Sequence, residues 1–213
     1  MQISTTEVKK RGRPATVGEE TKTKIVATTL DVLLELGYEK TSLDQIASQA
    51  SVAKKTIYRF SSGKDELIQL ALRSWTDSFK SCFEKDAASL DEFTRQLEDG
   101  LVTIGEQVLS PKAVRLFRLL QSDFPGRDEL TASYQQQGIQ RGRKILQLWM
   151  IKHSDLHIIP EQNFETLSNL LLAMVIAEPL RELALRQVPL IPVRDRAHKA
   201  VQLLLPSFTQ TSR

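Results

Sequence analysis

The sequence predicts an all-α protein with a small N-terminal helix-turn-helix domain and a larger helical domain. Three observations predict this fold class. Apolar residues recur three and four positions apart along most of the chain, no segment alternates apolar and polar residues as a strand does, and serine, proline and glycine stand where helices would begin and end. The 213 residues, 41% of them hydrophobic, suffice to bury a core.

The chain is expected to have three parts. Residues 1–18 lack periodicity and predict a disordered basic arm, residues 19–66 the helix-turn-helix domain, and residues 67–213 the larger domain. The longest apolar run is far below the roughly 18 residues of a membrane span, and the basic N-terminus lacks the apolar stretch of a signal peptide. Because Cys82 is the only cysteine, an intramolecular disulfide and a cysteine-based zinc site are excluded. We expect a cytoplasmic protein with no membrane partner.

The N-terminal part is predicted to contain three helices. Gly37 ends the first as a C-cap, and Ser42 with Gln45 forms a capping box at the start of the second. Ser-Ser-Gly then breaks the chain after the third. The three helices are expected over residues 20–36, over residues 43–49, and from Ala53 or Lys54 to about Phe60.

The larger part brings the expected total to about nine helices. Ser89 with Glu92 forms another capping box, and Pro111 takes the favoured first position of a helix. Pro179 is expected to kink its helix and Pro206 to end the last one. The expected helices begin at residues 64, 90 and 111 and cover residues 128–151, 162–187 and 192–205, with a turn at residues 124–126 and a connection at residues 153–160.

Positive charge is concentrated in the N-terminal third. Residues 9–13 form one basic cluster, residues 54–64 contain a second, and residues 51–64 contain no acid. Beyond residue 71 the charges nearly balance, so the net charge of +3 is carried unevenly. This distribution is typical of a local nucleic-acid footprint. Two ordinary solvated charge clusters would produce the same pattern.

The residue types of the third helix suit the major groove of DNA. Lys54 and Lys55 can reach guanine edges or phosphates, and Thr56 suits a phosphate oxygen. Tyr58, one turn later, can reach a phosphate with its hydroxyl or a thymine methyl with its ring, although the ring can also stack on the domain surface. Lys64 opens the next helix, where free N–H groups favour a phosphate.

These residues form a motif that is similar to a known one. Residues 20–70 resemble the DNA-binding domain of the TetR family of bacterial transcriptional regulators. The matching pieces are Ile25-Val26, Gly37-Tyr38, Thr41 to Ala47, Val52 to Tyr58, and Lys64 to Leu67. The resemblance implies a C-terminal domain that binds a small ligand and dimerises. It also implies DNA contacts by Thr41, Lys54, Lys55, Thr56, Tyr58 and Lys64.

Three positions depart from the family pattern. Ser51 stands where the turn usually has glycine, so a left-handed backbone there would cost about 1 kcal/mol. Ala53 replaces the usual serine cap and cannot accept a hydrogen bond from the helix end. The aromatic residue that ends the helix comes one position early, at Phe60, so either Arg59 or Phe60 would face the bases.

The N-terminal arm carries a second, separate signal. Arg11-Gly12-Arg13-Pro14 resembles the core of an AT-hook, in which arginines on an extended backbone enter a narrow A·T-rich minor groove. A plain basic tail is the alternative. In both cases Arg11 and Arg13 are expected to add affinity for DNA.

The last apolar segments are candidates for a dimer interface. Residues 164–177 are hydrophobic on all sides, and with the last helix they could form a four-helix interface across a two-fold axis. A core helix buried within one subunit is the alternative. The candidate interface residues are Phe164, Leu167, Leu171, Val175, Val201 and Leu204.

The middle helices are expected to hold a small-molecule effector. They combine aromatic side chains with a few polar groups, as ligand pockets do, and Gly138 and Gly142 would allow a close approach. The candidate effector-binding residues are Phe117, Arg118, Gln121, Tyr134, Arg141 and Trp149.

The sequence therefore predicts a homodimeric repressor that binds a double-stranded DNA operator and is released by a small molecule. No catalytic motif, cofactor site or metal site is expected, because His153, His157 and His198 lack a metal-binding pattern and no phosphate-binding loop occurs. Two alternatives remain: a DNA-binding architectural protein without an effector, and a helical enzyme with an appended DNA-binding domain.

Overall fold

The computed structural model describes residues 15–209, and within this range it contains helices and turns but no strand. The predicted all-α class is confirmed. The elements are α1 (Ala15–Leu36), α2 (Leu43–Gln49), α3 (Lys54–Ile57), α4 (Lys64–Asp77), η1 (Ser78–Phe83), α5 (Leu90–Val108), α6 (Pro111–Gln121), α7 (Arg127–Ser133), η2 (Tyr134–Gln140), α8 (Arg141–Asp155), α9 (Phe164–Leu172), η3 (Ala173–Ala177), α10 (Glu178–Ala184) and α11 (Val193–Thr209). Of the η elements, η1 is a 3₁₀ helix, while η2 and η3 are π-helical turns.

The predicted helix caps form. The Ser42 hydroxyl accepts a hydrogen bond from the N–H of Gln45, and Ser89 accepts one from Glu92 in the same way. Ser110 caps α6, which begins with proline. Gly37 takes a left-handed φ of +78°, and its N–H donates to the Leu33 carbonyl at 3.0 Å, which ends α1.

Three boundaries differ from the expectation. Helix α1 begins at Ala15, so residues 15–18 are helical rather than part of a disordered arm. Helix α3 ends at Ile57, and the chain continues to Ser61 as hydrogen-bonded turns. Pro206 lies inside α11 instead of ending it. Position 206 is exposed and close to the end of the helix.

The predicted connection at residues 153–160 also begins too early. Helix α8 continues to Asp155, and His153 is fully buried within it. Its Nε2 accepts a hydrogen bond from the N–H of Ala87 at 2.8 Å, and its Nδ1 lies 2.8 Å from the Trp149 carbonyl. His153 therefore ties the loop before α5 to α8, which sequence spacing did not indicate.

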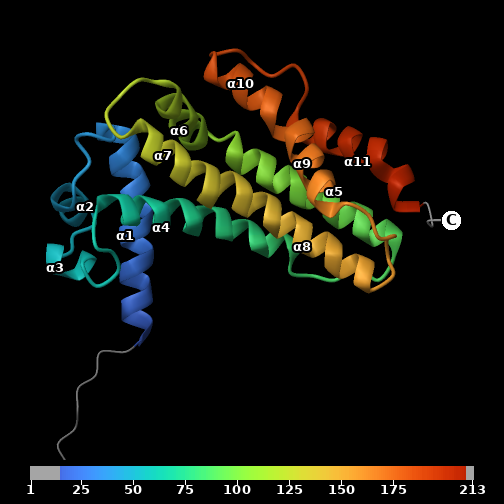
Figure 1. The fold of residues 1–213 in the computed structure, drawn as a ribbon, viewed down its shortest axis with the longest axis horizontal. Helices are drawn as coiled ribbons and strands as arrows, with labels where there is room; N and C mark the ends of the chain where they lie inside the picture. The colour runs from blue at the N-terminus through green and yellow to red at the C-terminus, as the bar shows by residue number, and fades with distance from the viewer. Residues whose placement is uncertain (1–14, 210–213) are drawn as a thin grey trace, which may run out of the picture.

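The molecule is elongated, with α1 to α3 at one end and the long helices α5, α8, α9 and α11 at the other (Figure 1). Helix α4 leads from the first region into the second. The predicted boundary after residue 66 falls inside α4, and a hydrophobic cluster around Leu30, Ile68, Leu72, Leu116 and Leu130 spans it. The two regions therefore share packed side chains.

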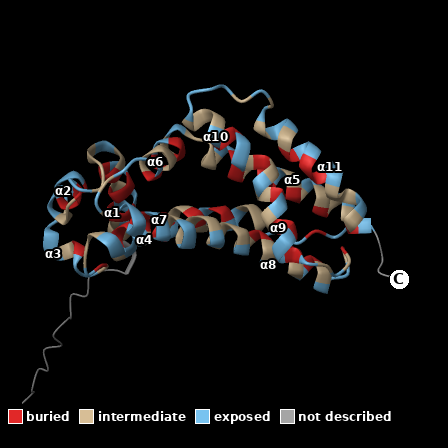
Figure 2. Ribbon diagram, turned by 45° about the horizontal axis from the view of Figure 1, so that its top comes forward, coloured by how far each residue is buried: buried red, intermediate tan, exposed pale blue. Residues whose placement is uncertain are grey.

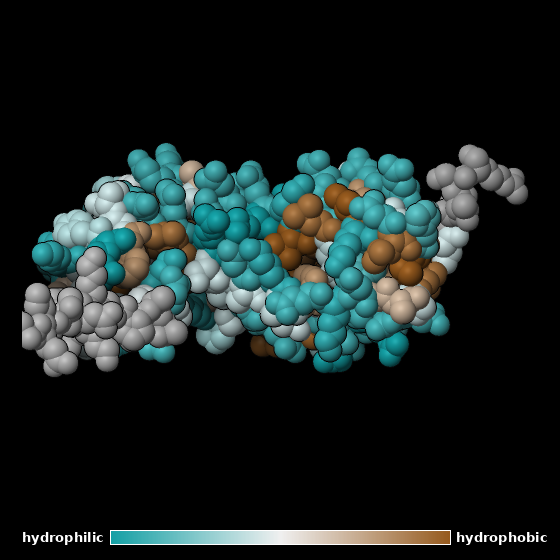
Figure 3. Space-filling model, turned by 90° about the horizontal axis from the view of Figure 1, so that it is seen from below, coloured by the Kyte–Doolittle hydropathy of each residue, from teal (hydrophilic) through white to brown (hydrophobic). Residues whose placement is uncertain are grey.

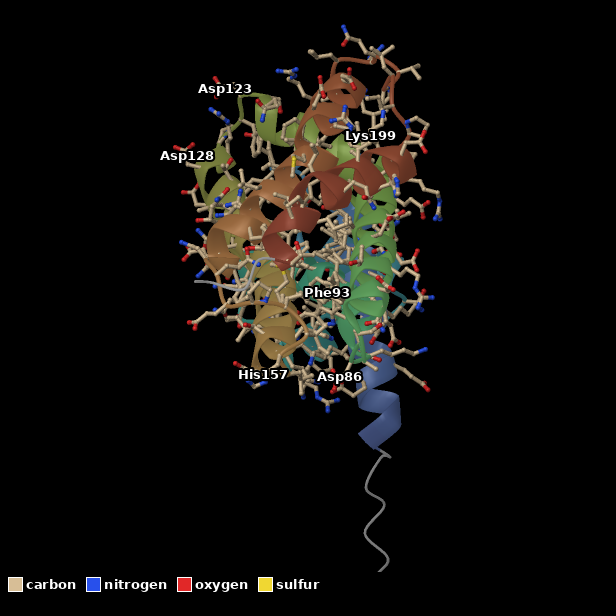
Figure 4. The ribbon with its side chains drawn as sticks, turned by 90° about the vertical axis from the view of Figure 1, so that its right-hand side faces the viewer. Asp86, Phe93, Asp123, Asp128, His157 and Lys199 are labelled. Carbon is tan, nitrogen blue, oxygen red and sulfur yellow. The ribbon has the colours of Figure 1, made fainter. Side chains whose placement is uncertain are left out.

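Two further clusters lie on either side of this shared one. The N-terminal cluster joins α1, α2 and α3 through Ile25, Ile46 and Ile57. The largest cluster lies between the long helices, and Figure 2 marks buried positions along them. Phe93 stands in this interior, whereas Asp86, His157 and Lys199 lie at the outside (Figure 4). Hydrophilic residues cover most of the face seen in Figure 3. No described helix is long and apolar enough to cross a membrane.

Candidate nucleic-acid interface and ligand cavity

A left-handed residue makes the turn between α2 and α3. Ser51 has φ +54°, its N–H donates to the Ser48 carbonyl, and the N–H of Val52 donates to the Ala47 carbonyl at 2.9 Å. This is a Schellman ending of α2, with serine in the position that usually holds glycine. The backbone thus adopts the conformation in which a non-glycine residue costs about 1 kcal/mol.

Helix α3 is short, and Ile57 is its one buried side chain. Ile57 is buried in the N-terminal cluster, and Phe60 packs against the same cluster. Lys55 and Arg59 are exposed, and Tyr58 is 55% exposed. Because Phe60 faces the core, Arg59 is the residue of the two that faces outward. As expected, Ala53 makes no capping hydrogen bond.

Lys54 is exposed but has a partner. Its ammonium lies 2.8 Å from Asp44 of α2, and this hydrogen bond raises the pKa of Lys54. Exposed ion pairs of this kind are weak, so a phosphate can compete with Asp44. Lys54, Lys55, Tyr58 and Arg59 together form what we call the α3 surface; Thr56, beside them, is half-buried.

Two of the predicted DNA-contact residues, Thr41 and Lys64, are less accessible to DNA than the α3 surface is. Thr41 is only 2% exposed, and its hydroxyl donates to the Gly37 carbonyl at 2.7 Å. The Lys64 ammonium donates to the Tyr38 carbonyl at 3.0 Å and lies 4.0 Å from the centre of the Tyr38 ring. Both residues support the end of α1 in this structure. Arg11 and Arg13 lie outside the described residues.

A joint that the sequence did not predict connects the N-terminal region to the turn between α6 and α7. The Tyr38 ring lies 5.6 Å from that of Phe124, and its hydroxyl donates to Asp65 at 2.6 Å. Gly126 has φ +87°, and a Cβ there would overlap the Tyr38 ring. Burial, followed by Asp65, raises the pKa of Tyr38, so the hydroxyl stays protonated. The only sequence signal was the expected turn at residues 124–126.

A cavity of about 310 Å³ lies in the larger domain. Helix α4 contributes Trp75 and Thr76 to its wall, and two of the predicted effector residues, Phe117 and Tyr134, line it. The remaining lining residues are Phe79, Ile104, Val108, Gly138, Ile139, Gly142, Arg143, Leu172, Ala173, Ile176, Ala177 and Leu180. Both π-helical segments contribute to the wall, and such turns often occur at functional sites.

The other four predicted effector residues do not line this cavity. Arg118 donates to the carbonyls of Leu183 and Ala184 at the end of α10, and Arg141 binds Asp77 at 2.6 and 2.8 Å. Gln121 is exposed. The Trp149 ring stacks on Phe93 in the largest cluster, with centroids 4.7 Å apart. All four were expected from residue type, but the neighbours of Arg118, Arg141 and Trp149 in the fold give these three a structural role.

The predicted dimer residues lie within one chain's core. Phe164, Leu167, Leu171 and Val175 on the α9–η3 segment and Val201 on α11 are buried, and Leu204 is half-buried against the same cluster. The alternative of a core helix thus describes them. Helix α9 packs against α8, and α11 packs against α5, within the same chain. Leu170 and Leu203, which are 50% and 72% exposed, are the large apolar residues that these two helices leave outside.

Residues 25–71, which contain the turn and the α3 surface, match the family model described as bacterial regulatory proteins, tetR family. This N-terminal region is therefore a DNA-binding domain of the TetR family of transcriptional regulators. A DNA-binding transcriptional repressor TetR of Mycobacteroides abscessus is 42% identical over 62 residues, which cover 29% of this chain and 33% of that protein. The regulator SrpR of Pseudomonas putida is 29% identical over 117 residues, 55% of this chain and 52% of its own. The chain thus aligns with a third to a half of these relatives.

Solved structures extend the likeness to most of the fold. A TetR transcriptional regulator from Agrobacterium tumefaciens has a TM-score of 0.67 at 17% identity, covering 87% of this chain and 93% of its own. The flavonoid-responsive regulator FrrA has a TM-score of 0.61 at 17% identity, covering 89% and 97%. At this identity the likeness concerns the fold alone. The family is one of regulators rather than enzymes.

Proposed function

We propose that this TetR-family regulator is a dimeric repressor that leaves its operator when a small molecule fills the cavity. One observation carries the proposal: α4 begins next to the helix-turn-helix and also forms a wall of the cavity. The name of the Mycobacteroides relative, a repressor, supports the sign of the regulation.

The α3 surface supplies the DNA contact in this proposal. Lys54, Lys55 and Arg59 place positive charge around the exposed Tyr58, and the buried Ile57 fixes the helix beneath them. Lysine and arginine can bind phosphates and guanine edges in the major groove. Asp44 holds the Lys54 ammonium until a phosphate replaces it.

Coupling follows from the length of α4. Lys64 and Trp75 are separated by about 16 Å along a helix axis, so a ligand that pushes on Trp75 moves the base of the DNA-binding region. The joint between Tyr38 and Gly126 connects the same region to the α6–α7 turn, and Phe117 of α6 also lines the cavity. A ligand therefore acts on the N-terminal region through two elements.

The dimer is proposed to form on the outer sides of α9 and α11, where Leu170 and Leu203 are exposed. Two copies related by a two-fold axis would present two α3 surfaces to half-sites about 34–36 Å apart, one turn of DNA. Ligand binding would change this separation, so the pair would no longer match both half-sites.

Selection of bound sequences from a random duplex library tests the proposal, with full-length protein as bait. We expect a two-fold symmetric consensus with half-sites one turn apart. An architectural protein would instead select no consensus. Adding a metabolite panel to the complex with the selected operator should identify a compound that releases the DNA and raises Tm of the free protein.

A further inference from the structure

The chemistry of the cavity restricts the ligand. Trp75, with its indole N–H, and Thr76, Tyr134 and Arg143 are the residues with polar groups in a wall that is otherwise apolar, and no aspartate or glutamate lines it. The Thr76 hydroxyl already donates to the Leu72 carbonyl at 3.0 Å. The Trp75 indole N–H, Tyr134 and Arg143 therefore remain as donors for polar recognition, and Arg143 is the charged one among them.

Arg143 differs from the two predicted effector arginines. Arg141, two positions earlier, has its charge neutralised by Asp77, and Arg118 is bound to the end of α10. Across residues 15–209, Arg143 has no carboxylate within ion-pair distance. A guanidinium at the edge of an apolar cavity attracts an anionic oxygen, which it can bind with two parallel hydrogen bonds.

We propose that the cavity takes an apolar monoanion whose acidic group binds Arg143 and whose body lies between Trp75, Phe79, Phe117 and Leu180. This inference rests on the proposed function and specifies its effector. A cationic ligand is disfavoured because it would lose its hydration in a wall that offers no carboxylate and would face the charge of Arg143.

Tyr134 adds a second polar point. It is half-buried, and burial raises the pKa of its hydroxyl, which therefore remains a hydrogen-bond donor at neutral pH. Tyr134 and Arg143 are about 13 Å apart along the helical axis. A ligand that reaches both would place its acidic group at Arg143. Its other end, at Tyr134, would be apolar or would carry one hydrogen-bond acceptor, such as a carbonyl or ether oxygen.

Two glycines leave room for the body of the ligand. A Cβ at Gly142 would lie 3.8 Å from the Thr76 methyl carbon, and one at Gly138 would lie 3.6 Å from the Tyr134 ring, so both positions accept alanine without overlap. Gly142→Ala thus narrows the cavity by one methyl group and also improves helix propensity. If this variant binds ligand more weakly but remains as stable as the native protein, the loss of binding comes from the smaller cavity and not from unfolding.

The test uses the full chain and two matched series of probes, one with a decyl body and one with a naphthyl body. Each series offers a carboxylate, an alcohol and an ammonium compound, and titration calorimetry below micellar concentrations gives each Kd. The better-fitting carboxylate is expected to bind about tenfold more tightly, or more, than the alcohol and the ammonium with the same body. Gly142→Ala should weaken all members of that series while raising Tm.

Arginine variants then locate the charge contact. Arg143→Met should weaken carboxylate binding by about tenfold or more and leave alcohol binding nearly unchanged, and Arg143→Lys should restore part of the preference. Arg115→Met is the matched control, because Arg115 is exposed on α6 and outside the cavity. It should bind every probe as the native protein does.

The proposal is overturned if no carboxylate probe binds, if the alcohol or ammonium binds as well as the carboxylate, or if Arg143→Met leaves carboxylate affinity unchanged. Binding of the same preparations to the selected operator is measured without ligand. Loss of operator binding in the native protein contradicts the proposed function. Intact operator binding without a carboxylate preference contradicts only the ligand class.

Discussion

Replacing Gly126 with alanine should destabilise the protein because two costs add. The first is the left-handed backbone, φ +87°, which costs a non-glycine residue about 1–2 kcal/mol. The second is the overlap of the new Cβ with the Tyr38 ring, which Phe124 and the Lys64 ammonium hold in place. Overpacking of this kind costs about 1–3 kcal/mol. The free energy of unfolding should therefore fall by about 2–5 kcal/mol.

Gly37 offers a matched control. Its φ is +78°, but a Cβ there meets nothing within 4 Å, so Gly37→Ala should show the backbone cost alone. Urea unfolding of both variants separates the two costs, and in a Tyr38→Ala background Gly126→Ala should show the backbone cost alone, because the ring that the Cβ overlaps is gone. If both alanine variants lose the same stability, the Tyr38 ring does not constrain the α6–α7 turn and the joint described above is refuted.

Three further predictions concern other parts of the chain. Ser51→Gly should raise the free energy of unfolding by up to about 1 kcal/mol, and with it the urea midpoint, because glycine relieves the strain of the left-handed turn. An unchanged or lower midpoint would contradict that strain. Leu170→Glu or Leu203→Glu should give folded monomers in sedimentation, whereas Leu171→Glu, at a fully buried position, should unfold the chain; a dimer that survives both exposed substitutions would exclude this interface. Burial raises the pKa of Asp77, but hydrogen bonds from Arg141 and Lys80 outweigh it, and the net pKa lies below 3.8. Its stabilising effect is therefore present above about pH 4 and is lost at lower pH, so the stability difference between native and Asp77→Asn protein should shrink on acidification.

Local features of the sequence predicted most of the fold. The caps at Ser42, Ser89 and Ser110 form because a serine hydroxyl binds an N–H three positions along the same chain, which requires no knowledge of the rest. The same is true of Gly37, whose φ ends α1. Pro206 shows the limit, since the local rule that proline ends a helix failed and α11 continues to Thr209.

The site was predicted less completely because a sequence shows which residues share a helix face but not what that face meets. Arg141 and Arg118 had suitable chemistry for a ligand, yet Asp77 and the end of α10 occupy them. Arg143, two positions from Arg141, was not a candidate. Leu171 and Val175 were apolar enough for an interface, but the fold buries them. The Tyr38 joint depends on contacts between residues far apart in sequence, which no local pattern encodes.

The central claim is that the α3 surface binds DNA, and a salt series of operator affinity for native protein, Tyr58→Ala and Lys55→Ala tests it most directly. Lys199→Ala serves as the matched lysine control, since Lys199 lies on the outer side of α11 (Figure 4). We predict a steep loss of affinity with salt, a shallower slope for Lys55→Ala, and about 1–3 kcal/mol weaker binding by Tyr58→Ala with unchanged Tm. A flat salt slope, or native affinity in both α3 variants, would contradict the account.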